Sequence, residues 1–220
     1  MIKKLLFSIL ILNSFSLMAQ TNSRVKNDPE AKKILEAVSS KFKAYQSASA
    51  NFSLKIENTE GKLVGSEKGA VQMKGDKYRI LTAERQIFSD GKTIWAYEIA
   101  DREVQVSTYD PKSDVMTPQK MFTNFYDNEY LYKLNDDHKV GNKFFIQIEL
   151  TPLDKTNLFF KLLVDIDKTT NNIAALKVFE KNGNRYTYTV TSFNSNMPLA
   201  DGLFVFDKKS YPNVEIVDLR

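Results

Sequence analysis

The sequence contains no cysteine. This absence excludes disulfide bridges, thiol nucleophiles and thiolate metal sites, and it also excludes acylation of a cysteine on the chain itself. Histidine is nearly absent as well, since the chain has only His138, which stands in the charged run 135–139. A lone histidine in a charged loop is usually a solvated side chain. We therefore expect no histidine-based catalysis and no histidine metal centre.

Motifs that carry chemistry are also missing. The chain has no glycine-rich phosphate-binding loop and no Gly-x-Ser-x-Gly nucleophile turn. Asp136 and Asp137 precede the histidine, but consecutive side chains point in different directions and no second cluster supports a metal site. Asp165 and Asp167 precede the polar run 168–172, where solvated turn caps are the ordinary role of carboxylates. With no nucleophile–base pair, we expect neither an enzyme nor a cofactor or bound metal.

The charge pattern does not indicate a nucleic-acid partner. The chain has 31 Lys and Arg against 27 Asp and Glu, a formal net charge of +4, with both signs interspersed and no basic block. A length of 220 residues with 42% hydrophobic residues suits one packed domain. The 15 Phe and 10 Tyr favour strands, because aromatic side chains suit half-buried pleated surfaces.

Residues 1–19 have the pattern of a cleavable signal peptide. Lys3 and Lys4 precede the apolar run 5–17, and Ala19 is a small residue at a plausible cleavage position. The run is too short for a comfortable membrane span, although an uncleaved anchor is the alternative. We expect an exported protein whose mature part, residues 20–220, forms a single domain.

One amphipathic helix is predicted near the start of the mature chain. Asp28 suits the N-cap position and Pro29 the first helical position. The apolar residues that follow recur at helical spacing and form one stripe over about five turns, so the helix is expected to cover a sheet. The stripe consists of Ala31, Ile34, Leu35, Val38, Phe42 and Tyr45.

From residue 50 the hydrophobic period changes from helical to two. Phe52, Leu54 and Ile56 alternate with polar residues, and similar strands follow up to about residue 106. The segment 86–97 holds the strongest hairpin signal, Asp90 and Gly91 between two apolar runs. Beyond this turn, alternation places Trp95 and Tyr97 on one face, in a row without catalytic residue types. We interpret the row as part of a cavity lining or of the core.

The segment 109–137 interrupts the strand pattern. Thr117 and Pro118 suit the start of a helix, and Met121, Phe122 and Phe125 follow at helical spacing. Further apolar residues, Tyr126, Tyr130, Leu131 and Tyr132, come close behind. The segment is expected to be a short apolar helix that acts either as a plug completing the core or as a movable lid over a pocket.

Alternation resumes at 144–151 and continues through 159–167, 173–180 and 185–193. The fold predicted from these patterns is mainly β, of the α+β class: an incomplete, curled antiparallel β-barrel of about ten or eleven strands, with helices forming a lid. Such a shell either fills its interior with side chains or holds an apolar ligand, and both alternatives remain open at this point.

Several segments, in order, resemble the periplasmic outer-membrane lipoprotein carrier (LolA) family. The motif 87–97, which includes Asp-Gly-Lys-Thr-x-Trp-x-Tyr, is similar to the family's central motif. The run 69–80 resembles its glycine-containing strand, and the ending 204–218 resembles its terminal phenylalanine-rich strand and proline-x-valine close. Together with the N-terminal helix, the strand with Phe52 and the helix opened by Thr117 and Pro118, the likeness covers almost all of the mature chain.

The resemblance implies a function in the periplasm. The family's members accept acylated lipoproteins released by an ATP-driven (ABC) transporter of the inner membrane, shield the acyl chains in a cavity and deliver them to the outer membrane, in some cases to a receptor. A monomer without cofactor is implied. One departure stands out, since the family's arginine–proline pair, whose arginine helps to latch the lid, is replaced here by Gly75 and Asp76. Arg79 lies nearby on the opposite strand parity to its neighbours, so the latch role is not transferred to it.

Candidate acyl-chain-binding residues follow from the strand parity and the resemblance together. The expected barrel lining comprises Phe52, Leu54, Ile56, Met73, Tyr78, Ile80, Trp95 and Tyr97, the expected lid residues are Met121, Phe122 and Phe125, and the helix closing the opening uses Ile34, Leu35, Val38 and Phe42. One bulge would invert a strand's parity. The alternatives are a lipid or lipoprotein sensor on the same fold, a carrier of another amphiphile such as a glycolipid, and a structural module with a filled barrel.

Overall fold

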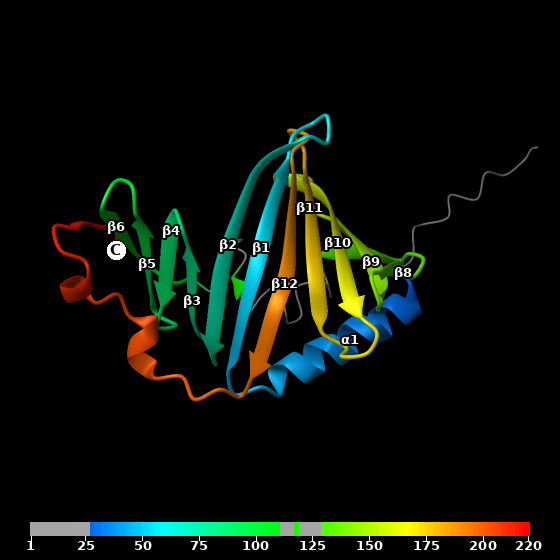
Figure 1. Cartoon of the computed structure of the whole chain (residues 1–220), viewed down its shortest axis with the longest axis horizontal. Coiled ribbons are helices and arrows are strands. Elements are labelled where there is room, and N and C mark those ends of the chain that lie inside the picture. Colours follow the sequence, from blue (N-terminus) through cyan, green and yellow to red (C-terminus); the bar gives the residue numbers. More distant parts are fainter. Residues whose placement is uncertain (1–26, 111–116, 119–128) are drawn as a thin grey trace, which may run out of the picture.

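One large sheet organises the part of the chain that the computed structural model describes, residues 27–110, 117–118 and 129–220 (Figure 1). Its strands follow the order β13-β6-β5-β4-β3-β2-β1-β12-β11-β10-β9-β7, and β8 pairs with β9. The strands are β1 (Ala48–Glu57), β2 (Leu63–Lys74), β3 (Lys77–Thr82), β4 (Arg85–Ser89), β5 (Thr93–Glu98), β6 (Glu103–Thr108), β7 (Tyr130–Leu134), β8 (His138–Val140), β9 (Lys143–Pro152), β10 (Phe159–Asp167), β11 (Ile173–Glu180), β12 (Arg185–Ser195) and β13 (Glu215–Asp218).

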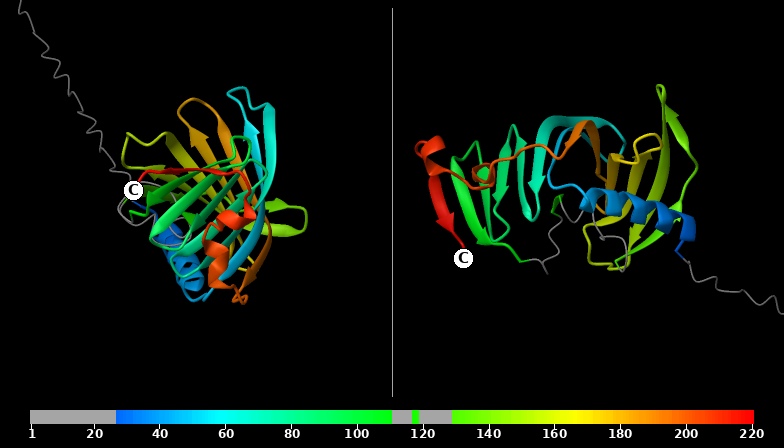
Figure 2. Two further views of the ribbon diagram at one scale, coloured as in Figure 1. Left: turned by 90° about the vertical axis from the view of Figure 1, so that its left-hand side faces the viewer. Right: turned by 90° about the horizontal axis from the view of Figure 1, so that it is seen from below.

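The sheet curls strongly but does not close (Figure 2). All neighbouring strands are antiparallel except β13 and β6, which are parallel. The predicted class, a mainly β chain with an incomplete curled antiparallel barrel, is thereby confirmed. The described part of the chain has more strands than expected, since β7 and β8 lie in segments that the sequence predicted to be helical or turn-like.

The helix α1 (Pro29–Lys43) lies across one face of the sheet, under the half formed by β12, β11, β10 and β9 (Figures 1 and 2). The Asp28 carboxylate accepts hydrogen bonds from the backbone N–H groups of Glu30 (2.8 Å) and Ala31 (3.3 Å), as predicted for an N-cap. With 15 residues the helix is about one turn shorter than predicted, because it ends before Tyr45. Among the described residues, no helix is long and apolar enough to cross a membrane.

The face of the sheet that α1 covers is called the inner face. Three buried α1 side chains pack there against strands at the β7 end of the sheet. Among the residues that the structure describes, this helix-side core is the largest buried cluster, and it fixes α1 on the sheet by apolar burial. It comprises Ala31, Leu35, Val38, Tyr130, Tyr132, Ile148, Leu150, Leu162, Val164 and Ile166.

The opposite, outer face of β3–β6 is covered by residues 196–218, called the strap. The strap leaves β12, passes through the 3-10 helices η1 (Asp201–Phe204) and η2 (Lys208–Ser210), and ends in β13 beside β6 (Figure 2). A second core, the strap core, lies between strap and sheet: Phe88, Val104, Phe206 and Val214, with Leu81, Trp95, Tyr97 and Tyr211 packed against it.

Three sequence predictions about local structure are wrong. Tyr130, Leu131 and Tyr132 form strand β7 rather than an apolar helical insertion, because they pair with β9 and bury both tyrosines beneath α1. The phenylalanine-rich strand that the resemblance implies from residue 204 is not formed there, since Asp201–Phe204 is a 3-10 helix, and Phe204 and Phe206 are buried. His138 lies in β8 and not in a turn.

Candidate functional site

An apolar pocket opens between the C-terminal end of α1 and the inner face of the sheet. Its enclosed volume is only about 20 Å³, room for about one water molecule, so the pocket is nearly closed in this structure. Its lining is almost entirely hydrophobic, as is typical of sites for apolar ligands. The lining residues are Val38, Phe42, Tyr45, Ala50, Met73, Asn171, Asn172, Ile173, Val190 and Phe193.

Aromatic packing holds the helix end over the pocket. Phe42 and Tyr45 meet edge to face with ring centroids 6.2 Å apart, and Tyr45 lies 5.7 Å from Phe193 of β12. The Lys41 ammonium donates a hydrogen bond to the Thr170 carbonyl oxygen in the β10–β11 turn. Since these contacts lie at one end of α1 and the large helix-side core lies at the other, the pocket is the less firmly closed side of the helix.

The β10–β11 turn supplies a polar rim to this apolar pocket. Asp167 is buried, and its carboxylate accepts the backbone N–H groups of Thr169 and Thr170, both at 2.9 Å. The Thr170 hydrogen bond is the main cause that lowers the pKa of Asp167. The turn then places Asn171, in the left-handed region with φ 55°, and Asn172 at the pocket. Two amides beside an apolar lining suit the polar end of an amphiphile.

The structure brings together only part of the predicted site. Val38, Phe42 and Met73 line the pocket, and Tyr78 and Ile80 lie in the cluster that surrounds Met73. Ile34 and Leu35 belong instead to the helix-side core. Phe52, Leu54 and Ile56 share the inner face of β1 with Ala50 but lie farther along the strand, and Met121, Phe122 and Phe125 lie outside the described residues.

Tyr78 is fixed in this inner cluster. Its side chain is only 4% exposed and hydrogen-bonds with Ser89, which is buried beside it on β4. Burial raises the pKa of Tyr78 to about 12, and the neighbouring Tyr109 adds to the shift. The phenol therefore stays neutral at physiological pH and contributes one satisfied polar group to an otherwise apolar face.

Trp95 and Tyr97 do not lie on the face where they were predicted. Directly paired residues of antiparallel strands share a face, and the pairs run from Met73 through Tyr78 and Ser89 to Ile94. The inner face of β5 therefore carries Ile94 and Ala96. Trp95 and Tyr97 point to the outer face and pack in the strap core, so their expected place in the same lining as Met73 is wrong.

The strap core is rich in ring contacts. Tyr97 lies 4.9 Å from Tyr211 and 5.9 Å from Phe206, and Phe206 stacks on Tyr211 at 4.6 Å. The Tyr211 hydroxyl donates to Gln86 Oε1 at 2.6 Å. The outer-face position of the Trp95 row thus has a structural role, since it buries one side of the strap.

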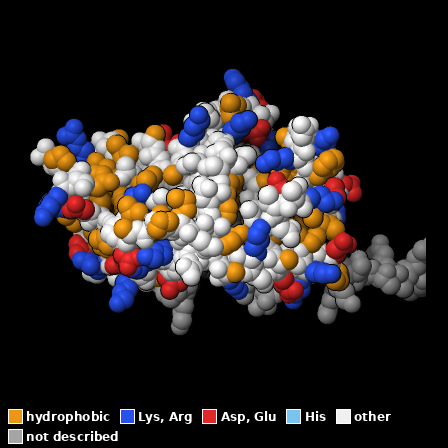
Figure 3. Space-filling view, turned by 60° about the horizontal axis from the view of Figure 1, so that its bottom comes forward, with side chains coloured by type: hydrophobic (Ala, Val, Ile, Leu, Met, Phe, Trp, Pro, Cys, Tyr) orange, Lys and Arg blue, Asp and Glu red, His pale blue; other side chains and the backbone are white. Residues whose placement is uncertain are grey.

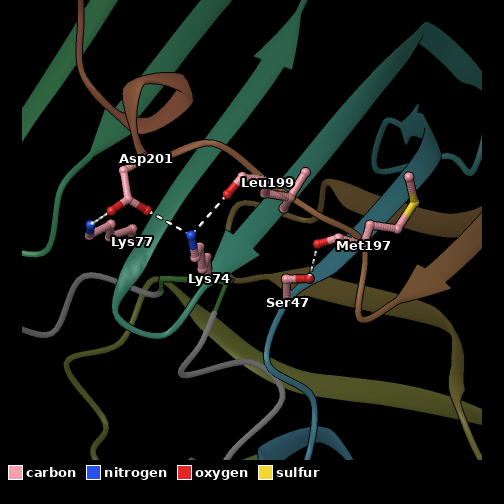
Figure 4. Close-up of polar contacts among 6 residues, drawn as sticks. All are labelled: Ser47, Lys74, Lys77, Met197, Leu199 and Asp201. Atoms are coloured by element: carbon pink, nitrogen blue, oxygen red, sulfur yellow. Dashed lines mark hydrogen bonds and ion pairs between the residues drawn. The ribbon is translucent and has the colours of Figure 1, made fainter.

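Polar contacts fix the start of the strap near the pocket end of β1 and β2 (Figure 4). Ser47 Oγ donates to the Met197 carbonyl oxygen at 2.6 Å, and Lys74 Nζ donates to that of Leu199 at 2.9 Å. Asp201 accepts from Lys74 at 2.8 Å and pairs with Lys77 at 3.0 Å. These two lysines, Lys74 first, lower the pKa of the Asp201 carboxyl.

Arg79 also lies on the outer face, where it pairs across the sheet with Phe88 and Gln72. Its Nε donates to Gln72 Oε1 at 2.5 Å, and burial lowers the pKa of its guanidinium. It points away from the pocket, a position that does not suit a latch for the helix over the inner face.

The remaining candidates for chemistry have structural partners. His138 stacks on Phe145 at 5.5 Å and lies 3.4 Å from Asp165, which also accepts a hydrogen bond from Gln147 at 2.9 Å. Asp167 caps its turn but is buried rather than solvated. Within the described ranges, no group of three or more His, Asp or Glu side chains could hold a metal ion.

Sequence reasoning missed seven lining residues. Tyr45 belonged to the predicted apolar stripe but not to the candidate site, and Ala50 precedes Phe52 on the same strand face, so both could have been included. Val190 and Phe193 were harder to assign, because the β1–β12 register shifts between Asn51 and Phe52 and reverses the parity of β12 there. The turn residues Asn171, Asn172 and Ile173 carry no apolar periodicity that would point to a pocket.

Comparisons with known proteins agree with this architecture. The model of the family described as "Outer membrane lipoprotein carrier protein LolA" matches residues 43–207. The outer-membrane lipoprotein carrier protein of Photobacterium profundum is 26% identical over 193 residues, covering 84% of this chain and 89% of that protein. Its counterpart in Vibrio campbellii is 27% identical and covers 98% of this chain and 96% of that protein.

A solved structure supports the fold alone. The crystal structure of an uncharacterised conserved protein from Thermus thermophilus is similar at a TM-score of 0.57 with 10% sequence identity. The likeness covers 86% of this chain and 99% of that one.

Proposed function

Because the chain belongs to the family of the outer membrane lipoprotein carrier protein LolA, we propose that it is an exported carrier which binds the acyl chains of lipoproteins between α1 and the inner face of the sheet. The function is one of binding rather than catalysis, in keeping with a carrier family. The proposed cargo is an acylated lipoprotein that has to cross an aqueous compartment.

The observation that carries the proposal is the apolar pocket with its polar rim. Six lining side chains from α1, β1, β2 and β12 are hydrophobic: Val38, Phe42, Ala50, Met73, Val190 and Phe193. An acyl chain exposed to water costs about 0.8 kcal/mol for each methylene group. A pocket of this composition removes that contact with water, while Asn171 and Asn172 can hydrogen-bond to the ester or amide groups at the head of the chain.

The helix α1 is the proposed movable cover of the site. The enclosed volume of about 20 Å³ is too small for even one acyl chain. Loading therefore requires the Phe42 end of α1 to move away from β12, while Leu35 and its neighbours keep the other end in the helix-side core. This movement exposes more of the inner face, including Phe52 and Ile80, to the cargo.

The proposed setting is the periplasm, reached by means of the signal peptide at residues 1–19. The donor would be an ABC transporter of the inner membrane and the acceptor the outer membrane, with or without a receptor there. The proposed working form is a monomer, since one chain supplies the complete pocket.

Site-specific photocrosslinking in cells tests this proposal. A photoreactive phenylalanine analogue replaces Phe42, which lines the pocket, or Ala37, which is exposed on the same helix. We expect crosslinks to lipoproteins from position 42 only, with depletion of the protein causing lipoproteins to be missorted. Equal crosslinking at both positions, or normal sorting after depletion, would contradict a carrier function.

Mass spectrometry of lipids extracted from the purified protein decides the class of ligand. Acylated peptides support the proposal. Glycolipids or other amphiphiles would indicate a different carrier or a lipid sensor on the same fold, and the recovery of no lipid from any preparation would favour a structural module.

A further inference from the structure

The end of the sheet remote from the pocket exposes several large hydrophobic side chains on one loop. Residues 153–158 join β9 to β10, and Leu158 is 80% exposed while Leu153 is 49% exposed. Phe160, at the start of β10, is 48% exposed. Isolated exposed leucines are common on protein surfaces, but three such side chains within eight residues form a local apolar projection.

Hydrogen bonds give this loop a defined shape. The Asp154 carboxylate accepts the backbone N–H of Thr156 at 2.7 Å and its hydroxyl at 2.8 Å, which lowers the pKa of Asp154. The backbone N–H of Leu153 donates to the Glu129 carbonyl oxygen at 2.8 Å, and that of Lys181 donates to the Leu158 carbonyl oxygen at 2.9 Å. The leucines are therefore held outward by an ordered turn.

Basic side chains surround the apolar projection. On the outer face, three cations lie close to the Phe179 ring centroid, Lys161 Nζ at 4.4 Å, Lys177 Nζ at 5.6 Å and Arg185 Cζ at 6.0 Å. Phe179 in turn lies 6.2 Å from Phe160. Two further lysines, Lys155 and Lys181, are exposed in the adjoining turns.

The acidic groups near this end are largely engaged in local contacts. Glu57 pairs with Lys177 at 2.8 Å, Asp154 is satisfied within its own turn, and Glu180 accepts a hydrogen bond from Asn182 at 2.8 Å. Hydrogen bonds from Thr156 and Asn182 do not neutralise Asp154 and Glu180. Counted together, five basic residues stand against four acidic ones, so this end has a small excess of positive charge: Lys155, Lys161, Lys177, Lys181 and Arg185 against Glu57, Glu129, Asp154 and Glu180. The upper edge of the face shown in Figure 3 carries several Lys and Arg side chains, with Asp, Glu and hydrophobic side chains among them.

We propose that this end, consisting of residues 153–160 with Lys161, Lys177, Lys181 and Arg185, is a docking surface for a lipid bilayer with anionic headgroups. Leucine and phenylalanine side chains enter the boundary between headgroups and acyl chains, and the surrounding cations lie at the level of the phosphates. The charge pattern selects anionic over zwitterionic lipid, since the apolar side chains alone do not distinguish the two.

The docking surface lies at the opposite end of β10 from the pocket. β10 starts at Phe159 beside the exposed loop and ends at Asp167, whose turn forms the pocket rim (Figure 1). Binding to a membrane and binding of a ligand in the pocket therefore do not compete for the same residues. The proposal does not depend on the identity of the cargo.

The lack of cysteine allows a direct test by single-site labelling. The full mature chain carries Leu158→Cys labelled with an environment-sensitive fluorophore, and Val205→Cys, exposed on the strap, is the matched control. Vesicles of phosphatidylethanolamine with phosphatidylglycerol should shift the emission of the label at position 158 to the blue and leave the control unchanged. Vesicles of phosphatidylcholine should give little shift at either position.

Co-sedimentation with the same vesicles measures the affinity of unlabelled variants. The double variant Leu153→Ser/Leu158→Ser should bind the vesicles at least about tenfold more weakly. In the double variant Lys155→Gln/Lys181→Gln, each lost lysine should weaken binding by about fivefold at low salt. Val205→Ser should bind like the wild type, and all variants should retain the wild-type thermal midpoint and binding of a fluorescent fatty acid. The proposal is overturned if the wild type does not bind anionic vesicles, if the leucine variant binds equally well, or if a label at Val140 on the β8–β9 hairpin shifts and the label at 158 does not.

Discussion

Phe206→Ala is expected to destabilise the protein without weakening ligand binding in the pocket. Phe206 is 8% exposed, and its ring lies 4.6 Å from Tyr211 and 5.9 Å from both Phe88 and Tyr97. Truncation of a buried phenylalanine costs about 3 to 5 kcal/mol. Since the strap is a single layer on the outer face and can relax into the space, we expect about 3 kcal/mol, or a fall of the melting temperature of about 6 to 12 °C for a chain of this size.

The assay uses the only tryptophan of the chain as a local reporter. Trp95 packs in the strap core, so its fluorescence during urea unfolding reports this face, while far-UV circular dichroism reports the whole sheet. Val205→Ala, one residue away and 42% exposed, is the matched control and should change the free energy of unfolding by less than about 0.5 kcal/mol.

Two results would refute this reasoning. If Phe206→Ala had the same stability as Val205→Ala, the strap core would not hold the strap to the sheet. If Phe206→Ala instead abolished binding of a fluorescent fatty acid at unchanged stability, the outer face would be part of the ligand site and the assignment of the two faces would be wrong.

Three further predictions concern groups around the inner face. Burial raises the pKa of Tyr78 to about 12, whereas a tyrosine in the unfolded chain has a pKa of about 10. The stabilisation that comes from keeping this phenol neutral is therefore complete below pH 10 and is lost as the pH rises toward 12. The difference in free energy of unfolding between the wild type and Tyr78→Phe, measured by urea denaturation, should therefore change by about 1 kcal/mol between pH 9 and 11. Asp167→Asn should lower the free energy of unfolding by about 1 to 2 kcal/mol at pH 7. Since the pKa of Asp167 is lowered in the folded protein, the difference in stability between variant and wild type should shrink as the pH falls below about 4. A difference that does not change with pH would contradict this. Gly69→Ala should cost about 1 to 3 kcal/mol in urea unfolding, because its Cβ would lie 2.4 Å from Cζ of Phe52, and the second change Phe52→Leu should recover part of the loss.

Local signals in the sequence predicted much of the architecture. The Asp28 cap, the apolar stripe of α1 and the Asp90-Gly91 turn depend on interactions between neighbouring residues, and all three were found where expected. Gly91 has a φ of 88°, and the Asp90 side chain accepts the backbone N–H of Thr93 at 2.8 Å. Such features do not require knowledge of the tertiary structure.

The choice of face for Trp95 could not be made from alternation. In β5, Ile94 and Ala96 on one face and Trp95 and Tyr97 on the other are all apolar or aromatic, and all are partly buried. Period-two patterns assign a face only when one side is polar. The strap that covers the second face is more than 100 residues away in sequence, so only the tertiary structure shows that both faces are covered.

The pocket was predictable only in part for the same reason. Val38 and Met73 follow from the periodicity of single elements, whereas the rim at Asn171 and Asn172 arises from the meeting of a polar turn with the end of α1. The strand β7 was missed because the apolar residues before it suggested that a helix continued, and β8 was missed because the charged run 135–139 suggested a loop. Pairing with β9, which no local pattern reveals, determines their conformation.

The pairing of β1 with β12 has a consequence for the order of assembly. Leu54 of the first strand lies opposite Tyr188 near the end of the chain, so the centre of the sheet joins segments synthesised far apart in time. Until β12 arrives, β1 has a hydrogen-bonding edge without its final neighbour, and such edges attract strands of other molecules. The slow step of folding is therefore expected to be the closure of this central seam, a long-range contact with a large loop-closure entropy. During biogenesis, protection of that edge by a folding helper would matter more than protection of either outer strand.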